Sequence, residues 1–181
     1  TIVSETRGLK TEQYRPGFTG GWLFHGVEGS IAGNSLFDKD GKLISTFTAK
    51  RKSENHFANF INAVRSRKRE SLNAEIQEGH LSTALCHIGN ISWRLGRESS
   101  ISEVREQVGK MKVHDNVVET LDRTLKHLDD NKVDLEKSRM TMGVRLEVSS
   151  KSEEFVGNAD ANKFLSREYR KPFVVPTETE I

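Results

Sequence analysis

The hydrophobic pattern of the chain changes its period near residue 50, and this change restricts the fold more than any other feature. Before it, short apolar runs alternate with glycines, and an Asp-Gly pair at 40–41 divides the run 36–47 as in a β-hairpin. After it, apolar residues return at the helical spacing i, i+3, i+4 and i+7, beginning at Phe57. The sequence therefore predicts an α+β fold with its strands first.

The hydrophobic spacing and the helix caps divide the chain into four segments. Residues 1–50 are β-rich, 53–97 hold two core helices, 98–140 form a helical insertion, and 141–181 contain a late strand, a short helix and an extended tail. Strands are expected at 2–9 and 143–148, in addition to the hairpin. Helices are expected from the cap Ser53, at 75–95 before Gly96, from the capping box Ser100–Glu103 to 111, at 117–131 and at 160–170.

Composition narrows the class of protein. The chain has 181 residues, of which 34% are hydrophobic and 30% charged, so it suits a domain with much polar surface or one whose core is completed by a missing portion. Because it begins at Thr1 in a segment that reads as a strand, we expect a fragment of a longer protein.

One cysteine excludes an internal disulfide framework, and a net charge of +2 argues against a nucleic-acid binder. No apolar run approaches the ~18 residues of a membrane span, so no membrane partner is expected, and the compartment is left unassigned.

The helix expected at 75–95 carries an unusual set of reactive side chains. His80, His87 and Cys86, the only cysteine, lie on it within two turns. Successive helical residues are about 100° apart, so Leu81, Leu85 and their apolar neighbours form a core stripe while Cys86 lies on a face of small residues. Free cysteines are commonly buried and inert. We therefore expect Cys86 to pack in the core, and a catalytic thiol is the alternative.

One edge of this helix is polar. His80, His87 and Arg94 are spaced seven residues apart and share that edge. The two histidine Cα atoms would be roughly 10 Å apart, whereas a metal ion bound by one helix takes histidines at i and i+4, so no metal site is expected. The edge either bonds to neighbouring backbone and carboxylates, or lines a cleft for anionic groups of a substrate or cofactor.

Two further features are candidates for function. His25 lies in a glycine-flanked strand and is either a half-buried sheet residue or a pocket-lining group. The basic run 65–69 ends a helix, where cations favour the helix dipole, and contact with nucleic acid is the weaker alternative because no aromatic residue interrupts the run. With the polar edge, the candidate substrate-cleft residues are His25, His80, His87 and Arg94.

Several segments together resemble the C-terminal domain of bacterial-type oxidoreductases of the Gfo/Idh/MocA family, which includes glucose–fructose oxidoreductase and inositol dehydrogenase. The strongest is HFANFINAVRSRKRESLNAEIQEGHLSTALCHIGNISWRLGR at 56–97. TIVSETRGLKT at 1–11 is similar to an upstream strand of the family, and FHGVEGSIAG at 24–33 to its Gly-x-Glu-Gly hairpin. EFVGNADANKFLSREYRKPFVVP at 154–176 is similar to its closing tail. The resemblance covers nearly the whole chain and is weakest over 98–140.

The resemblance implies a fold and a function. It implies an open, mostly antiparallel sheet with helices packed on one face, and homo-oligomers formed through the sheet. In the family an N-terminal Rossmann domain binds NAD or NADP, and the sheet domain faces the nicotinamide and a sugar or polyol substrate. A lysine of a Glu-Lys-Pro motif and downstream Asp or His residues handle protons.

The chain departs from the family in what it lacks. It has no dinucleotide fingerprint, no Glu-Lys-Pro segment and no assignable catalytic Asp/His motif, so it is expected neither to bind NAD(P) nor to turn over substrate alone. The leading hypothesis is the substrate-binding and oligomerisation domain of an NAD(P)-dependent oxidoreductase separated from its Rossmann half. The alternative is a non-enzymatic carbohydrate-binding or assembly module on the same scaffold.

Overall fold

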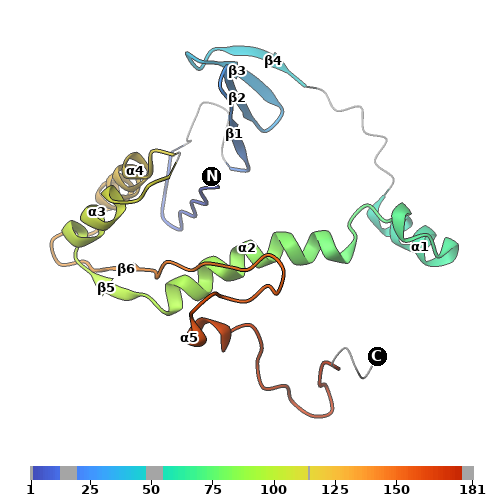
Figure 1. Cartoon of the computed structure of the whole chain (residues 1–181). Coiled ribbons are helices and arrows are strands. Elements are labelled where there is room, and N and C mark those ends of the chain that lie inside the picture. Colours follow the sequence, from blue (N-terminus) through green and yellow to red (C-terminus); the bar gives the residue numbers. More distant parts are fainter. Residues whose placement is uncertain (1, 13–19, 48–54, 114, 177–181) are drawn as a thin grey trace. The chain divides into compact units, whose positions relative to one another are not determined.

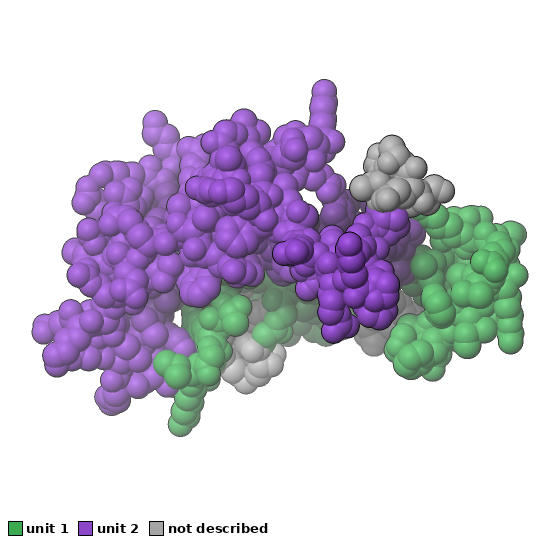
Figure 2. All heavy atoms as spheres, turned by 90° about the horizontal axis from the view of Figure 1, so that it is seen from below, with its two compact units in different colours: residues 1–73 green, residues 74–181 purple. Residues whose placement is uncertain are grey.

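The computed structural model describes residues 2–12, 20–47, 55–113 and 115–176. The chain forms two compact units, residues 1–73 and 74–181, which are coloured separately in Figure 2. Strands dominate the first unit and helices the second. The predicted α+β class is confirmed.

The first unit contains an open four-stranded sheet. All its neighbouring strands are antiparallel, in the order β1-β2-β3-β4 (Figure 1). The elements of this unit are β1 (Leu23–His25), β2 (Gly29–Ala32), β3 (Ser35–Asp38), β4 (Leu43–Thr46), the helix α1 (His56–Ser66) and a 3₁₀ turn, η1 (Arg69–Ser71). The open antiparallel sheet is as predicted.

The predicted hairpin is built around one aspartate. The Asp38 carboxylate accepts hydrogen bonds from the backbone N–H groups of Asp40 and Lys42, at 3.0 and 2.8 Å. An aspartate whose carboxylate accepts hydrogen bonds from the backbone N–H groups of the residues that follow it stabilises a tight turn. The bend at 40–41 between β3 and β4 therefore follows from the local sequence.

A buried asparagine fastens α1 to the turn that follows it. The Asn59 side chain donates to the carbonyl of Ser71 at 2.8 Å and accepts from the backbone N–H of Asn73 at 2.9 Å. Both bonds satisfy polar groups that would be costly to leave unpaired. Asn55 caps the helix, and the predicted cap Ser53 lies outside the described residues.

The second unit is mainly helical. Its two short strands, β5 and β6, pair antiparallel. None of the described helices has the length and apolar character needed to span a membrane. The elements are α2 (Ile76–Arg94), β5 (Arg97–Ser99), α3 (Ile101–Gly109), α4 (Val117–Asp130), β6 (Met140–Met142) and α5 (Ala159–Asn162).

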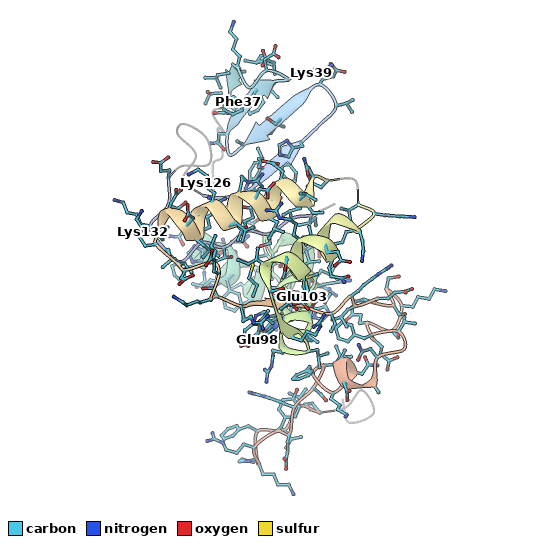
Figure 3. The ribbon with its side chains drawn as sticks, turned by 90° about the vertical axis from the view of Figure 1, so that its left-hand side faces the viewer. Phe37, Lys39, Glu98, Glu103, Lys126 and Lys132 are labelled. Carbon is cyan, nitrogen blue, oxygen red and sulfur yellow. The ribbon has the colours of Figure 1, made fainter. Side chains whose placement is uncertain are left out.

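The helices α3 and α4 share a small core of their own. Val104 of α3 packs with Leu121 and Leu125 of α4, and all three are buried. An ion pair between Arg105 and Asp122, at 2.6 Å, joins the two helices at the surface. In Figure 3 the two helices lie side by side, as their packing requires. β5 and β6 pair at the two ends of the segment that carries α3 and α4, so residues 97–113 and 115–142 form one local module.

The C-terminal segment packs on the last turns of α2. Ile91 forms a buried cluster with Phe155 and Ala161. The side-chain amide of Asn162 holds Phe155 in place, since it accepts from the Phe155 N–H at 2.8 Å and donates to the Phe155 carbonyl at 3.0 Å. This pair of bonds reproduces the pairing of a β-strand neighbour, so the segment gains a fixed position without a regular strand.

Two glycines allow the chain after β6 to lie directly against α2. A Cβ on Gly143 would lie 2.4 Å from the Oγ of Ser92, and a Cβ on Gly96 would lie 2.5 Å from the Met142 carbonyl. The same contact is bonded, because the Ser92 hydroxyl donates to the carbonyl of Val144 at 2.7 Å. Gly96 thus follows α2 as predicted, and the close approach of a second backbone segment requires it.

Three predicted elements differ from the structure. Residues 2–12 contain no strand, and 143–148 contain only the single bridge Val148–Phe155, so both predicted strands are wrong. The helix expected at 160–170 is only the four-residue α5. For the two strands the apolar pattern was present, but hydrogen bonding to a distant segment, which sequence spacing does not specify, decides whether a strand or a loop forms.

The close contact at Gly143 gives a test with a matched control. Gly143→Ala should lower the free energy of unfolding by about 1–3 kcal/mol, because the added methyl group overlaps Ser92. Gly89→Ala, an exposed position of α2 with open space at its Cβ, should instead raise it by about 0.5–1 kcal/mol through helix propensity. Urea denaturation measures both, and an equal effect of the two substitutions would contradict the contact.

The capping box of α3 gives a pH test. Hydrogen bonds from the Ser100 backbone N–H and then its hydroxyl lower the pKa of Glu103 in the folded chain. A carboxyl whose pKa is lower when folded stabilises the fold above its unfolded pKa, and this stabilisation is lost as the pH falls through the folded pKa. When the urea midpoints are measured at pH 7 and pH 3, the Glu103→Gln variant should lose less stability on acidification than the parent chain. Equal losses of stability in the two chains would contradict the capping box.

Candidate functional site

The first candidate site is a hollow on the face of the four-stranded sheet, which we call the sheet depression. It has a volume of about 500 Å³ and is lined by residues 24–31 together with Leu36, Phe37 and Ile44. Every strand contributes to it. An antiparallel sheet that is not covered on one face leaves such a hollow where the strands twist.

The floor of the sheet depression is apolar because the strand register aligns apolar residues. Phe24 pairs with Ile31, and Ile31 pairs with Leu36, so the three side chains share one face. Phe24 is 62% exposed and Ile44 is 59% exposed. Trp22 stands next to this row, with its ring centroid 5.0 Å from that of Phe24. The result is an exposed aromatic and aliphatic surface.

Polar groups lie at the β1–β2 end of the sheet depression. His25 is the last residue of β1, is exposed and lies in the lining of the sheet depression, and its role in binding stays a prediction. Glu28, in the following turn, forms an ion pair with Lys39 at 3.0 Å. Among the described residues no carboxylate is hydrogen-bonded to His25. The arrangement offers an imidazole beside an apolar floor, which suits binding better than proton transfer by a paired acid and base.

The second candidate site is the polar edge of α2, formed by His80, His87 and Arg94. The Nε2 atom of His80 lies 2.7 Å from a carboxylate oxygen of Glu153. The guanidinium of Arg94 lies 4.8 Å from the centre of the Phe164 ring, a cation–π contact. Two of the three side chains thus contact the C-terminal segment of the same unit.

His87, between these two, is exposed. His80 thus has the carboxylate partner that the first predicted role describes, whereas Arg94 contacts an aromatic ring instead. The second predicted role of the polar edge, a cleft for anionic groups, stays a prediction. His25 belongs to the first unit and the other three candidates to the second.

Neither partner of the polar edge was found from the sequence. Glu153 and Phe164 lie 73 and 70 positions after His80 and Arg94, respectively, and helical periodicity says nothing about such distant neighbours. Glu153 also adopts a left-handed backbone conformation, with φ of 56°, in the turn after Ser149. No local pattern marks a glutamate for that position.

The expected packing of α2 is only half right. Ile91 is buried and Ile88 and Leu95 pack beside it, but Leu81 and Leu85, in the first half of the helix, are 49% and 57% exposed. Cys86 is exposed as well, so the prediction that it packs in the core is wrong. The apolar side chains of the C-terminal segment pack on the last turns of α2. A hydrophobic stripe in the sequence does not show how much of its length another segment will cover. Trp93, near the end of the helix, is also exposed.

Carboxylates with lowered pKa lie elsewhere in the chain. A side-chain hydrogen bond from Lys137 lowers the pKa of Asp134, and one from Lys163 lowers the pKa of Asp160 and raises that of the lysine. The two residues of each exposed pair are three positions apart, so the pairs are local contacts. They therefore do not mark a catalytic centre. Among the described residues, no three His, Cys, Asp or Glu side chains gather to hold a metal ion.

Comparisons with family models, curated proteins and solved structures found no match to this chain. Function is therefore inferred from the geometry of the sheet depression and from the sequence.

Exposure of the only cysteine can be tested directly. A disulfide reagent such as DTNB should modify one thiol per folded chain within minutes, because Cys86 is exposed on α2. Denaturing the chain should raise the rate less than about tenfold. Cys86→Ser provides the blank. A thiol that reacts only after unfolding would show that the middle of α2 is covered.

Proposed function

We propose that this chain is the substrate-binding and assembly domain of an NAD(P)-dependent oxidoreductase that acts on a sugar or polyol-like molecule. A separate Rossmann domain would bind NAD or NADP, and the chain alone would have no activity. The observation that carries the proposal is the open antiparallel sheet with the sheet depression on its exposed face. The ordered motifs at 1–11, 24–33, 56–97 and 154–176 support it.

The chemistry of the sheet depression suits such a substrate. The carbon-bound hydrogens of a sugar or polyol ring form an apolar face that stacks on an aromatic side chain, and Phe24 and Trp22 offer one. The hydroxyl groups at the ring edge need hydrogen-bond partners, which His25 and Glu28 can supply. Binding in this way would orient the carbon that carries the hydride.

The cofactor must come from outside this sequence. The glycines at 26, 29, 33 and 41 lie in or between the strands of the sheet, and the sequence has no G-x-G-x-x-G turn that opens a helix, so the residues present do not fit a bound dinucleotide. When bound to its own domain, NAD or NADP accepts or donates the hydride. The part proposed for this chain is to hold the substrate against it.

The exposed edge strand of the sheet supports an assembly role. Every residue of β4 is exposed, and this strand is an edge of the sheet. An edge strand presents backbone groups on which a strand of a second copy can pair. We accordingly propose a homo-oligomer formed through the sheet.

A non-enzymatic carbohydrate-binding or assembly module is the second candidate. It is favoured by one observation, that among the described residues His25 has no hydrogen-bonded carboxylate partner. The gene sequence before Thr1 separates the two candidates. The oxidoreductase requires a strand followed by G-x-G-x-x-G and a Glu-Lys-Pro segment, and their absence would leave the binding module.

Calorimetric titration of the chain tests the binding site itself. We expect glucose or myo-inositol to bind weakly, and NAD⁺ and NADH not to bind. Phe24→Ala should weaken the sugar or polyol at least about tenfold, because stacking and burial are lost. Leu43→Ala is the matched control, since Leu43 is 53% exposed on the same sheet but does not line the sheet depression.

Two outcomes would contradict the proposal. Tight NADH binding by this chain alone would contradict both candidate functions. Equal weakening by Phe24→Ala and Leu43→Ala would show that the sheet depression is not where the ligand binds, even if the reading frame confirmed the oxidoreductase.

A further inference from the structure

No further inference is drawn: the strongest candidate, the exposed apolar stripe of α1 formed by Phe57, Phe60, Ile61 and Val64, lies on a helix whose buried Asn59 is bonded to the turn after it, and nothing in the structure shows what covers the stripe.

Discussion

The close contact between the end of α2 and the chain that follows β6 is the constraint that joins the parts of the second unit. Gly143 and Gly96 have no Cβ, so the end of α2 and the chain after β6 can approach closely, and the Ser92 hydroxyl donates a hydrogen bond from one segment to the other. This contact fixes where residues 144–148 leave β6, and the chain then returns so that Phe155 enters the cluster around Ile91. Protein interiors are packed densely enough that one added carbon at such a place is felt.

The polar edge of α2 contacts the C-terminal segment that this packing holds in place. Spaced His and Arg side chains on a helix can bind anions, but His80 and Arg94 instead contact Glu153 and Phe164. Both contacts are at the surface, where an ion pair contributes little to stability. Their effect is to favour one position of the C-terminal segment along α2. A binding role for the chain is therefore better supported at the sheet depression, where an exposed apolar floor lies beside polar groups such as His25.

Local signals predicted the helices well and the long-range contacts poorly. The four main helices follow from apolar spacing and caps, as the capping box Ser100–Glu103 shows. Periodicity also identified the stripe of α2, but it could not tell that the partner covers Ile91 and leaves Leu85 exposed. Strands at 2–9 and 143–148 failed because a strand needs a neighbour. For the site, the sequence singled out His25, whereas the row through Phe24 and Ile31 depends on strand register.

Hydrogen–deuterium exchange of backbone amides tests the central claim, that the last turns of α2 and the C-terminal segment form one cooperative unit. Amides that close the contact, those of Val144 and Phe155, should exchange together with the amide of Leu95, and more slowly than those at 80–85 in the exposed half of α2. Fast exchange at Val144 and Phe155 while the end of α2 stays protected would contradict the account, because the segment would then not be held by the helix.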